Sequence, residues 1–185
     1  MRKLVTKLLK AHATLRFCYE AGPCGYGLHR QLTEMGHDCV LVAPSMTPSR
    51  PGDRVKTDRR DAVLLARLHR AGELTAVWVP DEGHEAMRDL VRARTAAMEG
   101  LRRARQQLTG FLLRHDRVFR AGCNWTKKHR VWLATLRFEH PAHQIVLQEY
   151  IDAVDDAGHR LSRIEGQIRT LVPTWSLAPV VAAIQ

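Results

Sequence analysis

Three acidic residues have types and positions that suit phosphodiester chemistry. Glu20 directly follows a strand-like segment, Leu15 to Tyr19, and Asp58 and Asp61 lie three residues apart at the start of a predicted helix. Side chains three apart share one face of a helix, and carboxylate oxygens suit a hard cation such as Mg²⁺ or Mn²⁺. Metal ions held in this way activate water and stabilise the leaving oxygen of a phosphodiester. The pattern permits these three acids to be catalytic and metal-binding residues, although a single acid after a strand, such as Glu20, is common.

A purely structural role for the two aspartates is the alternative interpretation. Acids in the first turn of a helix interact favourably with the helix dipole. Asp58 and Asp61 also flank Arg59 and Arg60, whose charges they balance. The spacing permits a metal site without requiring one, so both interpretations stay open at this point.

The elements that would position these acids begin with an alternation of strand-like and helix-like segments. The sequence predicts a strand over Leu15–Tyr19, a helix over Gly25–Met35 that ends at Gly36, and a buried strand over Cys39–Ala43. A strand, helix and strand in this order form a βαβ unit, which requires a parallel sheet. We therefore expect an α/β fold with Glu20 at the carboxyl edge of the sheet, where such folds place their sites.

A further helix is predicted from Asp58 to Ala71. Thr57 is a suitable N-cap and Gly72 a suitable stop. The residues expected on its buried face are Val63, Leu64, Leu65 and Leu68. A short extended segment, Ala76–Val79, then ends a first domain that we place at residues 1–80.

Apolar residues in 81–175 recur at alternating steps of three and four, as in helices that pack along a seam. The first stripe consists of Met87, Leu90, Ala97, Leu101, Ala104, Leu108 and Phe111, interrupted by Arg94. The second stripe consists of Leu147, Tyr150, Val154, Ala157, Leu161, Ile164, Ile168 and Leu171. We expect two long helices that form either an antiparallel hairpin (coiled-coil) arm or a dimerisation seam. Residues 120–141 are expected to be a basic, tryptophan-containing connection, and residues 176–185 the start of a linker.

The charge balance points to a polyanionic partner. The chain has 29 Lys and Arg against 19 Asp and Glu, a formal net charge of +10. Cationic side chains displace counterions from a phosphate backbone, so nucleic acid is the natural partner, although a solvated basic surface remains the alternative. The cations expected to contact phosphates are Arg50, Arg54, Lys56, Arg59, Arg60, Lys127, Lys128 and Arg130.

Two tryptophans in the basic connection have two possible roles. Trp125 and Trp132 either stack on nucleobases or fix the helical connection by burial, and the sequence favours neither. Other classes of site are disfavoured. The four cysteines form no CxxC pair, and His140 and His143 have no third zinc ligand nearby.

No run of apolar residues is long enough to span a bilayer, and the lysine-containing N-terminus is a poor signal peptide. The sequence therefore predicts a cytoplasmic protein without a membrane partner.

Several motifs in order resemble the IS110-type insertion-sequence transposases. They are YEAGPCGYG at residues 19–27, RVKTDRRDA at 54–62, LTAVWVP at 74–80 and LRFEHP at 136–141. The resemblance implies an N-terminal domain like the RuvC resolvase, with an RNase H-like fold and an acidic set of Asp, Glu, Asp, Asp. Glu20 matches the glutamate of that set, and Asp58 and Asp61 match its last two aspartates.

The resemblance also implies parts that have no match here. The first aspartate of the set is expected upstream of Met1, and a C-terminal domain with a proposed nucleophilic serine is expected beyond Gln185. We therefore expect a partial RuvC-like domain and a helical arm, truncated at both ends and poorly active or inactive alone. The implied partners are DNA (the insertion-sequence ends and the target), an element-encoded guide RNA, and a second copy bound through the arm.

Three functional hypotheses follow. The first is an Mg²⁺- or Mn²⁺-dependent transposase that cleaves and recombines DNA strands. The second is a non-catalytic remnant that dimerises and binds DNA or RNA. The third is a nonfunctional reading frame left by a decayed element.

Overall fold

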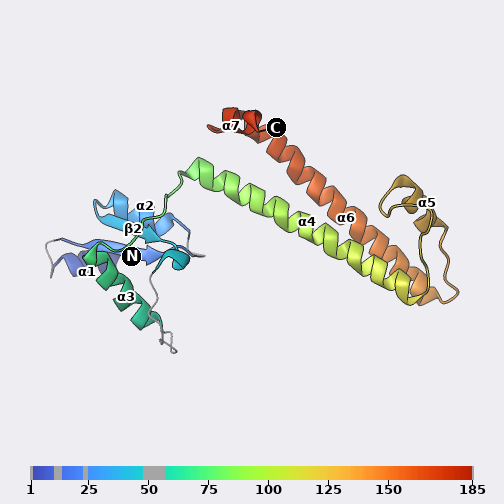
Figure 1. The fold of residues 1–185 in the computed structure, drawn as a ribbon, viewed down its shortest axis with the longest axis horizontal. Helices are drawn as coiled ribbons and strands as arrows, with labels where there is room; N and C mark the ends of the chain where they lie inside the picture. The colour runs from blue at the N-terminus through green and yellow to red at the C-terminus, as the bar shows by residue number, and fades with distance from the viewer. Residues whose placement is uncertain (1, 11–13, 23–24, 48–56, 185) are drawn as a thin grey trace. The chain divides into compact units, whose positions relative to one another are not determined.

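The computed structural model describes residues 2–10, 14–22, 25–47 and 57–184. The chain divides into two compact units, residues 1–81 and 82–185, which we call the α/β unit and the hairpin unit (Figure 1).

A parallel pair of strands organises the α/β unit. Strand β1 (Arg16–Glu20) pairs with β2 (Asp38–Val42) so that Cys18 lies opposite Val40. Helix α2 (Gly27–Glu34) connects the two strands and packs against β2. The predicted βαβ unit and its parallel sheet are therefore confirmed.

The connecting helix begins two residues later than predicted because a turn precedes it. Gly25 has a φ of 59°, a left-handed conformation that suits glycine, and its N–H donates to the Gly22 carbonyl oxygen (3.2 Å). The Tyr19 hydroxyl donates to the Gly25 carbonyl oxygen (3.1 Å) and accepts from the His29 N–H (3.3 Å). These bonds tie the turn to β1 and to the first residues of α2.

A small apolar core is formed by the first helix, α1 (Arg2–Leu9), together with α2 and the sheet. Val5 of α1, Leu32 of α2 and Cys39 of β2 are its buried members, with half-buried Phe17 and Leu28 packed against them. The amphipathic sequence of α1 explains its place, since its single fully buried residue faces this core and its lysines remain exposed.

Helix α3 (Asp58–Ala71) has the bounds and caps that the sequence predicts. The Thr57 hydroxyl accepts from the Arg60 N–H (3.4 Å), and Gly72 ends the helix with a φ of 75°. Leu65 and Leu68 are buried, but Val63 is 44% exposed, so its predicted burial is wrong. The helix packs on β1 through one face, and two residues of helix turn by about 200°, which directs Val63 away from that face.

The extended segment after α3 contributes one bridge, not a third strand. Ala76 bridges Val42 in antiparallel fashion, and the Val77 N–H donates to the Leu41 carbonyl oxygen (2.7 Å). Leu41 and Val42 are each 1% exposed, so this segment covers the most buried part of β2. A 3₁₀ turn, η1 (Pro44–Met46), follows β2.

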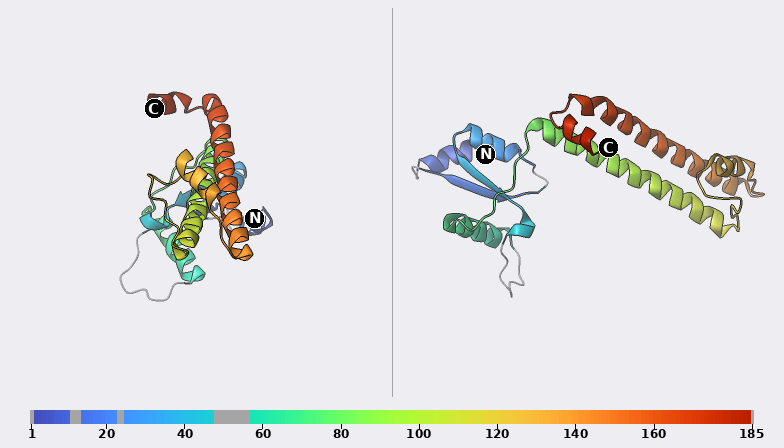
Figure 2. Two further views of the ribbon diagram at one scale, coloured as in Figure 1. Left: turned by 90° about the vertical axis from the view of Figure 1, so that its right-hand side faces the viewer. Right: turned by 45° about the horizontal axis from the view of Figure 1, so that its top comes forward.

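Two long helices form the hairpin unit. Helix α4 (Glu82–Arg114) packs antiparallel against α6 (Pro141–Leu171) through residues of both apolar stripes (Figures 1 and 2). The predicted antiparallel hairpin within one chain is therefore present. Leu171, the last residue of the predicted second stripe, is 44% exposed, so the seam does not extend to it. Arg94, which interrupts the first stripe, forms an ion pair with Glu165 on α6 (2.8 Å between Nη2 and Oε1), so the interruption has a partner on the facing helix.

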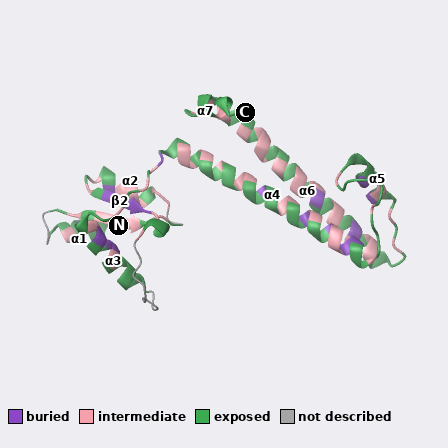
Figure 3. Cartoon of the chain, in the orientation of Figure 1, coloured by how far each residue is buried: buried purple, intermediate pink, exposed green. Residues whose placement is uncertain are grey.

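The connection between the long helices contains a helix of its own, α5 (Lys127–Thr135), capped by the Thr126 hydroxyl. We call residues 115–140 the hairpin tip. Buried residues concentrate in the half of the hairpin nearer to α5, as Figure 3 shows. The buried apolar cluster there consists of Ala104, Leu108, Phe111, Leu112, Leu133, Leu147 and Val154. The tip is therefore packed against the long helices and is not a loose loop.

The C-terminal end of the hairpin unit has further helical structure. A 3₁₀ turn, η2 (Val172–Thr174), leads to helix α7 (Ala178–Ala183), within the segment expected as a linker. The Trp175 ring contacts the His84 ring edge-on, at 5.5 Å between centroids. In the described part of the chain, no helix combines the length and apolar character needed to cross a membrane.

Candidate metal and nucleic-acid site

Glu20 lies where the sequence places it, at the carboxyl end of a parallel strand. It is the last residue of β1, pairs in register with Val42, and is exposed. The next residue, Ala21, donates its N–H to the Val42 carbonyl oxygen (2.7 Å), which holds this end of β1 against β2. The backbone at Glu20 is therefore held in place by β2, and its side chain is exposed to solvent.

Asp58 and Asp61 occupy the first turn of α3, and both are exposed. The Thr57 cap fixes this turn, and residues three apart on a helix bring their Cβ atoms to within roughly 5–6 Å of each other. The backbone therefore presents two neighbouring carboxylates to solvent, at a helix terminus that also stabilises negative charge.

The oxygen atoms of these three acids are suitable ligands for Mg²⁺, but the three side chains are not grouped into one site. Among the residues that the structure describes, no three His, Cys, Asp or Glu side chains are grouped closely enough to hold a metal ion. Glu20 is therefore not gathered with Asp58 and Asp61 into a three-ligand site. The aspartate pair alone fits the usual manner of Mg²⁺ binding, by one or two carboxylates with waters and substrate phosphates completing the shell.

The predicted phosphate-binding cations fall into two groups. Arg59 and Arg60 are exposed in the first turn of α3, beside the aspartates. Arg50, Arg54 and Lys56 lie outside the described residues.

The second group, Lys127, Lys128 and Arg130, lies on α5 in the hairpin tip. Lys127 and Lys128 are exposed, and no carboxylate pairs with them in the described ranges. Arg130 forms an ion pair with Asp155 of α6 (2.6 Å between Nη1 and Oδ1). Sequence reasoning missed Asp155, because residues 130 and 155 meet only once the hairpin has folded.

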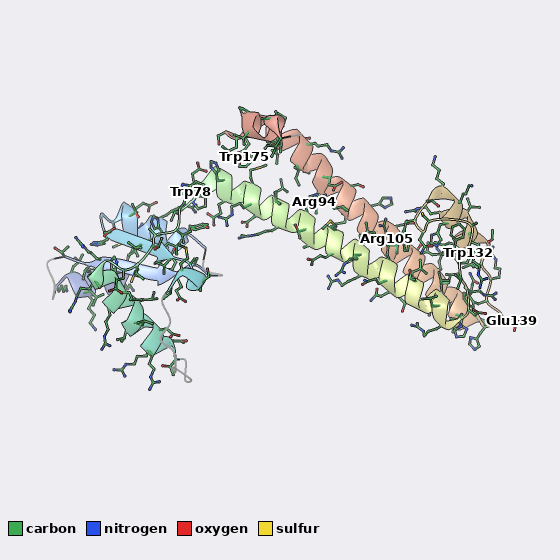
Figure 4. The ribbon with its side chains drawn as sticks, in the orientation of Figure 1. Trp78, Arg94, Arg105, Trp132, Glu139 and Trp175 are labelled. Carbon is green, nitrogen blue, oxygen red and sulfur yellow. The ribbon has the colours of Figure 1, made fainter. Side chains whose placement is uncertain are left out.

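The two tryptophans of the tip have different surroundings. Trp132 packs against Phe119 and His129, with ring centroids 5.4 and 5.5 Å away. Trp125 is half-buried, and the Arg105 guanidinium from α4 lies over its ring at 4.9 Å from the centroid. Figure 4 labels Arg105 and Trp132 in this part of the hairpin. Trp132 therefore packs within the tip, whereas Trp125 also borders a pocket between the helices.

His129 holds Trp125 in an uncommon backbone conformation. Trp125 has a φ of 69°, which a bulky residue rarely adopts. Its N–H donates to Nδ1 of His129 (3.2 Å), and His129 is 3% exposed. Burial, followed by the neighbouring Arg130 charge, lowers the pKa of His129 below its ordinary value of 6.5. The imidazole is therefore neutral at neutral pH and accepts this bond.

This geometry predicts that the hairpin unit loses stability as the pH falls below about 6.5. Because the pKa of His129 is lower in the folded chain, the unfolded chain takes up the proton first and is favoured by acid. The measurement is the melting temperature between pH 7.5 and 5. In His129→Asn, whose amide oxygen can replace Nδ1 as acceptor, the melting temperature should fall less steeply with acid. An equal slope in this variant and the wild type would contradict the role of His129, and the exposed His159→Asn is the control.

The chain thus combines an α/β unit and a helical hairpin with a basic tip. The α/β unit has carboxylates at the end of a strand and at the start of a helix, and this combination defines the class of protein. The family model of the IS110-type transposases, described as "Transposase", matches residues 1–115. The chain therefore belongs to the IS110 transposase family.

Two curated relatives agree with this assignment. The chain is 52% identical over its full length to a protein named "Putative transposase y4qE" from Sinorhizobium fredii, of which it covers 44%. It is 35% identical over 173 residues (92% of its length) to the "Transposase for insertion sequence element IS1533" from Leptospira borgpetersenii, of which it covers 50%. The chain thus spans about half the length of these relatives. No solved structure matches it.

Proposed function

We propose that the chain serves in DNA transposition by an IS110-type transposase, binding DNA and taking part in metal-dependent strand cleavage and recombination. The observation that carries the proposal is the exposed pair Asp58 and Asp61 at the start of α3, in a chain that belongs to this family. The DNA partners would be the ends of the insertion sequence and its target. A guide RNA encoded by the element and a second copy of the chain are further partners that the family resemblance suggests.

In this proposal Asp58 and Asp61 would hold Mg²⁺ or Mn²⁺, and Glu20, which is not grouped with them in the structure, would be the third catalytic acid. The metal, when bound, would supply charge stabilisation at the reacting phosphodiester. Arg59 and Arg60 lie in the same helical turn and would attract the strand by their charge. The parallel β1–β2 pair with α2 across it is compatible with part of an RNase H-like (RuvC-like) sheet, which we include in the proposal.

A non-catalytic role in binding DNA or RNA is the second candidate. The absence of a three-ligand metal group among the described residues favours it. It shares with the first candidate the basic hairpin tip. The six cations of the tip are Arg117, Arg120, Lys127, Lys128, Arg130 and Arg137, against two carboxylates, Asp116 and Glu139. Both candidates therefore require nucleic-acid binding, and only the first requires metal.

The salt dependence of binding tests this shared requirement. We expect the full chain to bind a labelled DNA duplex with an affinity that falls as salt rises. Changing both Lys127 and Lys128 to alanine should weaken binding and reduce the slope of log K against log salt by about 2, since each phosphate contact contributes roughly 0.9. Fluorescence anisotropy at several salt concentrations measures both quantities.

Arg92→Ala serves as a control, because Arg92 already pairs with Asp89 on α4 (2.9 Å) and lies outside the tip. Its slope should match that of the wild type. A wild-type chain without measurable affinity for DNA or RNA would overturn both candidate functions.

A further inference from the structure

A pocket of about 260 Å³ lies between α4, α5 and α6 beside the hairpin tip. Its apolar lining includes Leu108, Leu133 and Val154, one from each helix, all at most 5% exposed. Trp125 and Ile151, both half-buried, also line it. Drug-sized ligands occupy pockets of roughly 300–1,000 Å³, so this one suits something smaller, such as a single planar ring system beside an indole.

The remaining lining residues are more polar and more exposed. They include the Arg130–Asp155 ion pair, whose side chains are 55% and 38% exposed, and Gln148, which donates to Asp152 (2.9 Å). Together these side chains carry guanidinium and amide N–H donors and carboxylate and amide oxygen acceptors. Nucleobases have this character, with flat apolar faces and edges that present both donors and acceptors.

The cations next to the pocket indicate where the phosphate of a bound nucleotide would lie. Lys127 and Lys128 follow Trp125 by two and three residues and form the first turn of α5. Two cations at a helix N-terminus oppose the helix dipole, and the first amides of a helix lack partners within it. A bound phosphate would offset both effects. The sequence thus places an anion-attracting turn directly beside the aromatic wall of the pocket.

From this arrangement we infer that the hairpin tip binds an unpaired nucleotide, with its base in the pocket beside Trp125 and its phosphate near Lys127 and Lys128. The inference rests on the proposed nucleic-acid function and adds to it a preference for unpaired bases. Base stacking on aromatic side chains does not depend strongly on base identity, so the site recognises that a base is unpaired more than which base it is.

Trp125, which lines the pocket, is held in place before a ligand binds. The bond from the Trp125 N–H to His129 fixes the backbone of the indole, and the Arg105 guanidinium over the ring restricts the side chain. A side chain that is already ordered loses less conformational entropy when a base stacks on it. The φ of 69° at Trp125 is thus held, by the bond to His129, at a residue that lines the pocket.

The test fills the pocket without changing charge or removing a core residue. Ala134 is an exposed lining residue on α5, and Ala134→Phe should occupy the space where the base would lie. Val131 is 66% exposed on the same helix and does not line the pocket, so Val131→Phe is the matched control. The probes are a labelled single-stranded DNA, a single-stranded RNA, and an abasic phosphodiester of the same length, each measured with the full chain by fluorescence anisotropy.

We expect Ala134→Phe to weaken binding of the base-containing strand roughly tenfold and to leave binding of the abasic strand unchanged. Val131→Phe should bind all probes like the wild type. The stronger binder of the two base-containing strands identifies DNA or RNA as the natural source. Circular dichroism verifies that both variants are folded.

Equal affinity of the wild type for the base-containing and abasic strands would overturn the inference, as would equal effects of the two phenylalanine variants. In those cases the salt-dependent binding of DNA would still support the proposed function. Loss of all binding by the wild-type chain would instead overturn both.

Discussion

Replacing Asp58 and Asp61 with asparagine should abolish Mn²⁺ binding by the chain. The two carboxylates share one exposed face of the first turn of α3, and asparagine keeps their size while removing the charge that a hard cation requires. Titration of free Mn²⁺ by electron paramagnetic resonance measures the change. Helicity should persist, because losing each favourable dipole interaction costs only about 0.3–1 kcal/mol.

A charge-matched control distinguishes a specific Mn²⁺ site from general electrostatic attraction of the cation. Glu99→Gln combined with Asp116→Asn also removes two exposed carboxylates, but from the hairpin unit, and should leave the Mn²⁺ affinity unchanged. Glu20→Gln tests the third acid separately: weakened binding would identify Glu20 as a ligand. Unchanged affinity in the double asparagine variant would leave the two aspartates with a structural role at the helix terminus.

The second large effect concerns stability. Leu108→Ala should destabilise the hairpin unit by roughly 2–5 kcal/mol, the usual result of truncating a buried leucine. Leu108 is 1% exposed and packs in the cluster that joins α4, α5 and α6. For a unit of this size the melting temperature should fall by roughly 10 °C or more. Thermal unfolding followed by circular dichroism at 222 nm measures it.

Leu113 on the same helix provides the control, because it is 59% exposed. Leu113→Ala should change stability by no more than about 0.5 kcal/mol. Equal losses in the two variants would contradict the assigned packing of α4.

Features with local signals could be predicted from the sequence. Helix α3 has its predicted bounds because a capping threonine and a left-handed glycine mark its two ends. The βαβ order and the two long helices are likewise predicted by the spacing of apolar residues, and all of these elements are present. The same spacing could not decide between a hairpin and a dimer seam, which depends on whether the facing helix belongs to the same chain.

Features that depend on distant residues could not be predicted. The exposure of Val63 follows from which face of α3 meets β1. The pocket combines residues of α4, α5 and α6 that no sequence pattern connects, and the Arg130–Asp155 pair spans its border. Glu20 and the aspartates each lie at the predicted place in their elements, but sequence spacing says nothing about how far apart those places are.

Iron-directed cleavage tests the central claim, a metal held by Asp58 and Asp61 against bound nucleic acid. Fe²⁺ would replace Mg²⁺ in the full chain bound to a branched DNA. Added hydrogen peroxide would oxidise the bound Fe²⁺ to Fe³⁺ and yield hydroxide and a hydroxyl radical, which would cut whatever lies nearby. We predict cuts in the DNA and in the protein backbone around residues 57–61, suppressed by excess Mg²⁺ and absent from the double asparagine variant. DNA that binds but is not cut, or cuts that persist in the variant, would contradict the claim.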